Sequence, residues 1–156
     1  MNRPTRPSRR PAGRCVCLLL PALLCALAAQ AQIRTDGSLG QAAQNLAGPN
    51  YAILESMGKR TSNNLFHSFQ TFKVGAGETA TFRTTTPTIA NVIGRVTGGE
   101  VSTINGVLKL QAAAGTPALY LVNPAGVTFG PGASIDVPGA FHVSTADYIK
   151  FPAGNF

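Results

Sequence analysis

Four prolines recur at an interval of seven residues near the end of the chain, and this period restricts the possible folds more than any other feature. Pro117, Pro124, Pro131 and Pro138 mark the units TPALYLV, NPAGVTF, GPGASID and VPGAFHV. A heptad marked by proline is incompatible with a coiled coil, because proline breaks the helical hydrogen-bond ladder. The unit instead fits a strand of about four residues and a turn of about three. Three units would make a rung of about 21 residues in a solenoid of short parallel strands.

Short segments rich in β-branched and aromatic residues fill the chain after Asn64. Each is bounded by Gly, Pro, Asn or Thr, which is typical of strands that end in turns. The stretch at 45–60 stays ambiguous between a short strand and one turn of helix. We therefore expect an all-β fold. The expected strands are 65–74, 79–82, 91–96, 106–110, 118–122, 127–129, 134–137 and 140–143.

A sandwich of antiparallel hairpins is the alternative architecture. Such hairpins are often joined by Asn-Gly or Asp-Gly turns, and the chain has one of each. Asp36-Gly37 lies outside the strand-rich part, whereas Asn105-Gly106 could join strands at 101–104 and 107–110. The proline period favours the solenoid, and the sandwich stays open.

Three phenylalanines follow one another at a spacing of three, at Phe66, Phe69 and Phe72. A helix would gather them on one face. In a regular strand, Phe66 and Phe72 would share a face while Phe69 points to the other. We interpret the segment as a strand with a bend, with most of these rings in the core.

The segment at 1–31 has the composition of an export signal. Five arginines lie within its first fourteen residues, and an apolar stretch of fourteen residues follows at 15–28. Such a stretch, at about 1.5 Å per residue, is too short to cross a hydrocarbon core of about 30 Å. Ala29 and Ala31 stand where signal peptidase expects small residues. We therefore expect a signal peptide at 1–31, recognised by the Sec translocon and cleaved by signal peptidase after Ala31, and an exported domain at 32–156.

The charge of the chain is concentrated in this leader. The whole chain has 13 basic and 6 acidic residues, giving +7, and the five leader arginines leave 8 basic and 6 acidic residues, or +2. A nearly neutral domain is not expected to bind nucleic acid. The leader also contains all three cysteines, Cys15, Cys17 and Cys25. The exported part therefore has no disulfide, thiolate metal site or cysteine nucleophile.

The exported part lacks the residue constellations of an enzyme. Its acidic residues lie at least 11 residues apart. Glu78 and Glu100 are separated by about one expected rung, so a solenoid could stack them in a hydrolase cleft. His67 and His142 have no neighbouring ligand, and a zinc site needs three or four. We expect both histidines at the surface or half-buried in strands, and no catalytic residue, metal or cofactor.

Five ordered blocks of the exported part resemble one family. The chain is similar to the N-terminal secretion domain of two-partner secretion exoproteins of the filamentous haemagglutinin type. The resemblance runs from about Ile33 to the end of the chain. The blocks are 36–40 (DGSLG), 64–69 (NLFHSF), 91–99 (NVIGRVTGG), 119–132 (LYLVNPAGVTFGPG) and 141–149 (FHVSTADYI).

The resemblance implies a right-handed parallel β-helix with a role in transport. In that family the domain is the address label of a large secreted adhesin or haemolysin. The POTRA domains of a cognate outer-membrane β-barrel recognise it in the periplasm, and the chain is then threaded outward. The product would be secreted or held at the surface of a Gram-negative-type bacterium, with a host or surface glycan as its adhesive target.

The family's NPNGI motif falls on 123–127 (NPAGV), with Ala in place of the second Asn and Val in place of Ile. The earlier NPNL-type motif has no counterpart, because Thr86-Pro87 stands where an Asn-Pro pair is expected. The motif residues are predicted either to contact the transporter or to turn a corner of the β-helix. The candidate recognition residues are Asn64, Leu65, Asn123, Pro124, Ala125, Gly126 and Val127.

The end of the chain bears on its function. Residues 151–156 resemble the start of another repeat, so we expect a secretion domain that is truncated at its C-terminal end. The alternative function is a stand-alone carbohydrate-binding or polysaccharide-acting β-solenoid, for which Glu78 and Glu100 would be the starting point.

Overall fold

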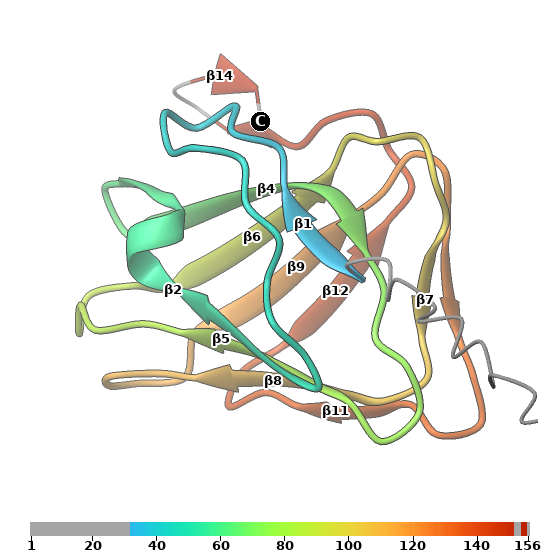
Figure 1. The fold of residues 1–156 in the computed structure, drawn as a ribbon. Helices are drawn as coiled ribbons and strands as arrows, with labels where there is room; N and C mark the ends of the chain where they lie inside the picture. The colour runs from blue at the N-terminus through green and yellow to red at the C-terminus, as the bar shows by residue number, and fades with distance from the viewer. Residues whose placement is uncertain (1–31, 152–153, 156) are drawn as a thin grey trace, which may run out of the picture.

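The computed structural model describes residues 32–151 and 154–155 (Figure 1). The signal peptide expected at 1–31, with Ala29 and Ala31 at its cleavage site, lies outside the described residues. Within them, the helical structure is one short 3-10 turn, η1 (Glu55–Met57), and no helix is long and apolar enough to span a membrane. The described part is a stack of short strands.

The largest sheet contains one strand from each rung. β4 (Asn64–Phe72), β6 (Asn91–Val96), β9 (Ala118–Val122) and β12 (Phe141–Ser144) pair in parallel and in this order. Asn91 pairs with Asn64 and Ala118 with Asn91, so these two rungs are each 27 residues long. Phe141 pairs with Leu119, which makes the last rung shorter by five residues. No pair in this ladder is local in sequence.

Two further parallel sheets complete the coil. β2 (Asn50–Leu54), β5 (Thr79–Arg83), β8 (Val107–Gln111) and β11 (Ser134–Asp136) form the second sheet. β7 (Ser102–Ile104) and β10 (Val127–Phe129) form the third. Figure 1 shows these strands winding around a common core. The parallel β-solenoid expected from the proline period is confirmed, and the antiparallel sandwich is wrong.

The Asn105-Gly106 pair turns a corner of the coil, because β7 and β8 on either side of it belong to different sheets. Gly106 lies against the rung below. A Cβ atom on it would lie 2.3 Å from the carbonyl oxygen of Glu78 and 2.4 Å from that of Gly75. Glycine is required here because the backbones of two rungs meet, and not because of a hairpin turn.

The four prolines mark corners, as predicted. Pro117 precedes β9, and the other three lie between β9 and β10, β10 and β11, and β11 and β12. The rung length expected from the proline period agrees closely with the last rung but is too short for the two earlier ones. Those rungs carry longer corners, such as residues 84–90, that the period does not describe. The ambiguous stretch at 45–60 contains both β2 and η1.

The first rung is closed by antiparallel strands. β1 (Ile33–Thr35) and β3 (Lys59–Thr61) both pair with β4 on the side away from β6. Leu46 N donates to the Ile33 carbonyl over 2.9 Å, and Ile33 is fully buried. These segments cap the core at this end. A short antiparallel pair, β13 (Lys150–Phe151) and β14 (Gly154–Asn155), follows the last rung.

A cluster of aromatic rings fills the core beneath this cap. Phe69 and Phe72 have ring centroids 5.0 Å apart, and both pack on Phe82. The register between β1 and β4 shifts between Arg34 and Thr35, which marks a bulge in β4. The expected bend is confirmed, and so is the expected burial of most of these rings, because the bulge brings Phe69 and Phe72 to the same buried side.

The last rung leaves its inward side chains partly exposed. Phe129, Ile135 and Val143 continue the core stacks, and their register partners in the preceding rung are at most 1% exposed. These three side chains are themselves 45%, 39% and 41% exposed. Among the described residues, the core is therefore closed at one end and open at the other.

Candidate functional site

The NPAGV segment forms a tight corner between β9 and β10. Asn123 Oδ1 accepts a hydrogen bond from Ala125 N over 2.9 Å, and the Asn123 carbonyl accepts one from Gly126 N over 2.9 Å. Gly126 has φ = +115°, which glycine tolerates best. Pro124 is exposed at the tip and supplies the fixed φ that such turns favour.

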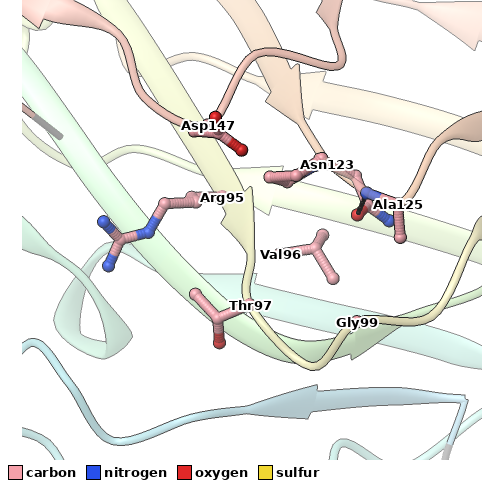
Figure 2. Close-up of a pocket in the computed structure, with 8 residues that line it drawn as sticks. Arg95, Val96, Thr97, Gly99, Asn123, Ala125 and Asp147 are labelled. Atoms are coloured by element: carbon pink, nitrogen blue, oxygen red, sulfur yellow. Dashed lines mark hydrogen bonds between the residues drawn. The ribbon is translucent and has the colours of Figure 1, made fainter.

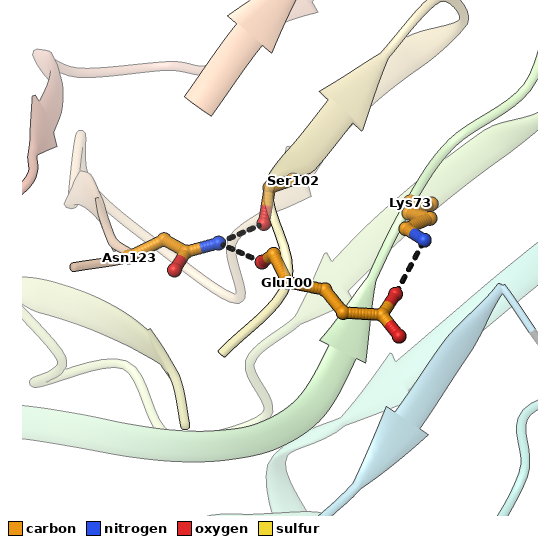
Figure 3. Close-up of polar contacts among 4 residues, drawn as sticks. All are labelled: Lys73, Glu100, Ser102 and Asn123. Carbon is orange, nitrogen blue, oxygen red and sulfur yellow. Dashed lines mark hydrogen bonds and ion pairs between the residues drawn. The ribbon is translucent and has the colours of Figure 1, made fainter. Parts of the chain in front are cut away.

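The Asn123 side chain joins this corner to the rung below it (Figure 3). Asn123 is fully buried, and its Nδ2 donates to the Glu100 carbonyl over 2.8 Å and to Ser102 Oγ over 2.9 Å. Its backbone N–H donates to the Ser144 carbonyl over 3.0 Å in the rung above. One residue therefore ties three rungs together, and every polar atom of its amide is used.

The outward side of the corner forms one wall of a cleft of about 320 Å³ (Figure 2). The Asp147 carboxylate points into this cleft, while the Arg95 guanidinium is directed away from Asn123 toward Ser68. Pro124 and Ala125 are therefore accessible to solvent on the cleft side of the corner, whereas the side-chain hydrogen bonds of Asn123 lie on its inner side. The lining residues are Arg95, Val96, Thr97, Gly99, Asn123, Pro124, Ala125 and Asp147.

Asn64 and Leu65 lie elsewhere. They begin β4, whereas 123–127 follows the end of β9, and the two strands run in parallel on either side of β6. Asn64 Oδ1 accepts a hydrogen bond from Asn91 Nδ2 over 2.8 Å, and Leu65 is 1% exposed in the core. The structure therefore places the two groups of candidate residues at opposite ends of the sheet and does not bring them together.

The corner at Thr86-Pro87 is held by Glu55, which the sequence analysis did not single out. The Glu55 carboxylate accepts hydrogen bonds from the backbone N–H and the hydroxyl of both Thr85 and Thr86, over 2.5 to 2.9 Å. Burial acts to raise the pKa of Glu55, but these bonds outweigh it and lower the pKa to about 2. A carboxylate from the preceding rung thus holds this corner in place. The corner at 123–127 is held instead by a buried asparagine.

Asp36 fastens the DGSLG segment to the coil. Its Oδ2 accepts hydrogen bonds from Ser68 Oγ over 2.6 Å and from Thr97 Oγ1 over 2.8 Å, and its Oδ1 accepts one from Ser38 N. Burial opposes ionisation, but these bonds hold the pKa of Asp36 below its usual value. Because Thr97 also lines the cleft, the cap and the cleft share one polar network.

Glu78 and Glu100, which a solenoid could have stacked in a hydrolase cleft, do not lie together. Glu78 precedes Thr79, which pairs with Val107, so Glu78 lies beside Gly106 in the next rung. Its carboxylate accepts hydrogen bonds from Gln32 Nε2, Tyr51 OH and Gly75 N. Glu100 instead forms an exposed ion pair with Lys73 over 2.5 Å (Figure 3).

The two histidines differ sharply. His67 is 1% exposed, so its expected place at or near the surface is wrong. Burial lowers the pKa of His67 to about 4, against the attraction of Glu55. His142 is exposed and stacks on Tyr120 with ring centroids 4.5 Å apart. Across the described residues, no group of three His, Cys, Asp or Glu side chains lies close enough together to hold a metal ion.

Comparison with known proteins connects this coil to a transport function. The family model of the TPS secretion domain, where TPS denotes two-partner secretion, matches residues 31–156. The comparison with curated proteins found no match. A TPS secretion domain directs the export of a Gram-negative exoprotein through a cognate outer-membrane transporter, and it is a targeting domain, not a catalytic one. Because the match covers most of the chain and the fold is the parallel solenoid that the resemblance implies, the chain belongs to the TPS secretion domain family.

Proposed function

We propose that the chain is the transport address of an adhesin-like exoprotein, recognised in the periplasm by the POTRA domains of its outer-membrane β-barrel. In this proposal the Sec translocon exports the chain, signal peptidase removes residues 1–31, and the coil folds outside the cell. Adhesion to a host or surface glycan belongs to the exoprotein as a whole. The match of residues 31–156 to the TPS secretion domain carries the proposal.

The register of the coil supports a threaded, late-folding chain. Strand partners lie a full rung apart in the sequence, and pairing between such distant segments is slow. No cysteine follows Cys25, so an oxidising periplasm cannot cross-link the exported part. A segment that is still unfolded can add a strand to the edge of a POTRA sheet through backbone hydrogen bonds.

The corner at 123–127 has separable inner and outer sides. Asn123 faces inward and holds the rungs, whereas Pro124 and Ala125 face the cleft. We propose that the outer side contacts the transporter. Asn123→Ala should reduce export, but it would also weaken the coil, so it cannot separate recognition from folding.

Three other substitutions make the distinction. Ala125→Asp changes the outer side and leaves Asn123 and its partners in place, and Ala125→Asn supplies the residue that the family motif has here. Ser102→Ala removes one inner partner of Asn123 without touching the outer side. The amount of chain in the medium is measured for each variant, together with its urea unfolding midpoint.

The proposal predicts that Ala125→Asp lowers export at least several-fold with an unchanged unfolding midpoint, and that Ala125→Asn matches or exceeds the natural chain. Ser102→Ala should lower the unfolding free energy by about 1 to 2 kcal/mol, because a buried donor loses its partner, and should leave export nearly intact. If export followed the unfolding midpoint across all variants, the corner would act only in folding.

A further inference from the structure

His67 lies in the most enclosed polar position of the first rung. Its side chain is 1% exposed, and neither ring nitrogen has a hydrogen-bond partner among the described residues. The ring packs at 6.1 Å from the Phe69 ring and edge-on at 5.5 Å from the Phe82 ring, measured between centroids. Buried polar groups in proteins are nearly always paired, so this imidazole is exceptional.

Four segments of the chain form a cage around the His67 ring. The residues that they place there are phenylalanines and glycines. β4 contributes Phe69, β5 contributes Phe82, and β6 places Gly94 directly beside His67 in register. On the remaining side, a Cβ atom on Gly58 would lie 2.9 Å from His67 Cε1. None of these four residues carries a side chain that could pair with the ring nitrogens.

The charged group that acts on the ring is Glu55 of η1, whose attraction favours the protonated imidazole. That carboxylate is already held by hydrogen bonds from Thr85 and Thr86. Its attraction does not overcome the loss of hydration, because burial is the larger influence and lowers the pKa of His67 from 6.5 to about 4.

We propose that His67 is an acid-sensitive lock on the coil: the ring must be neutral to occupy its cage, and mild acid therefore shifts the chain toward the unfolded state. The unfolded chain hydrates its imidazole and binds the proton freely, whereas the folded chain excludes it. Because this histidine joins the first rung to the ring cluster beneath the cap, its protonation opposes folding of the whole coil.

The direction with pH follows from linkage. The pKa of His67 is lower in the folded state, so the unfolded state binds more protons between pH 6.5 and about 4. The stabilisation is complete above pH 6.5 and is lost as the pH falls through this window. Glu55 and Asp36, the carboxyl groups with lowered pKa, have ordinary pKa values of 4.5 and 3.8, so in the unfolded chain they titrate mainly below pH 5. The interval from pH 6 to 5 therefore reports mainly on His67.

The test is urea unfolding of the full chain at pH 7.5, 6 and 5, for the natural chain, His67→Phe and His142→Gln. Phenylalanine fits the aromatic surroundings and carries no titratable proton, and His142 is an exposed histidine that serves as the matched control. We expect the unfolding equilibrium constant of the natural chain and of His142→Gln to rise about sevenfold from pH 6 to 5. That of His67→Phe should change less than about twofold.

A second measurement needs no substitution at His67. The imidazole resonances of the folded natural chain are followed by NMR from pH 8 to 5. The ring whose resonances remain in His142→Gln is that of His67, and it should not titrate in this range. Equal pH dependence of unfolding in the natural chain and His67→Phe would overturn the proposal. So would an ordinary titration of the His67 ring in the folded chain, including in the case where His67→Phe does not fold.

Discussion

At the scale of single residues, the coil depends on positions where two rungs touch. Asn123 fills such a position with an amide whose three hydrogen bonds are all made within the protein. Gly106 fills another by having no side chain at all. Both residues stand in turn motifs of the sequence, but both act on partners in a neighbouring rung that the local sequence does not display.

Gly106 offers the sharper test of this rung contact. Gly106→Ala should lower the free energy of unfolding by about 3 kcal/mol, because its Cβ atom would overlap two backbone oxygens that cannot move without shifting the rung below. Gly115→Ala is the matched control. A Cβ atom there meets nothing within 4 Å, and its φ of +69° alone should cost about 1 kcal/mol. Equal losses in urea unfolding would contradict the rung contact, because the φ of Gly106 lies outside the left-handed region and gives no other reason for glycine there.

At the scale of elements, polar side chains of neighbouring rungs contact one another at a spacing of 27 residues. Tyr51 contacts Glu78, Asn64 contacts Asn91, Lys73 contacts Glu100 and Lys109 contacts Asp136, each at this spacing. Two of these pairs are exposed salt bridges, which typically contribute less than about 1 kcal/mol. These side-chain pairs therefore mark the register between rungs more than they stabilise the coil.

Engineered disulfides test this register in a chain whose three natural cysteines are replaced by serine. Thr81 and Lys109 are paired in parallel on the outer side of the second sheet. Thr81→Cys with Lys109→Cys should therefore cross-link readily, because neighbouring strands lie about 4.8 Å apart.

The matched control shifts one cysteine by two residues on the same face. Thr81→Cys with Gln111→Cys should not cross-link, because its Cα atoms would be about 8 Å apart. Thiol titration after mild oxidation of the folded chain distinguishes the two pairs. Cross-linking of the shifted pair instead of the paired positions would contradict the register.

The parts of this fold that were predictable are those with a local cause. Each proline requires a break in the strand ladder, so the corners around the last rung followed from Pro117 to Pro138. The longer rungs before them have no such marker. The bulge that turns Phe69 and Phe72 to one side depends on pairing with β1, which the sequence does not display.

The candidate site was likewise predictable only where its structure has a local cause. The tight turn at 123–127 was predictable, because proline and glycine fix its backbone. Its attachment was not, because the partners of Asn123 lie at Glu100 and Ser102 in the preceding rung. The cage of His67 likewise depends on Gly58 and Phe82, which only the coil brings together.

At the scale of the whole molecule, the described part of the coil is closed at one end and open at the other. β1 and β3 cover the first rung, whereas the inward side chains of the last rung are partly exposed. All three parallel sheets must form together, since each rung contributes to more than one of them. Slow formation of such a structure is compatible with the proposed folding of the chain outside the cell.

Dependence of export on the transporter is the most direct test of this account. The full chain is expressed in its own bacterial host, with the gene for the cognate outer-membrane transporter either intact or deleted, and the chain is quantified in the medium and in the periplasm. The account predicts that deletion abolishes the chain in the medium and leaves it unfolded and protease-sensitive in the periplasm. Equal amounts in the medium of both strains would contradict it.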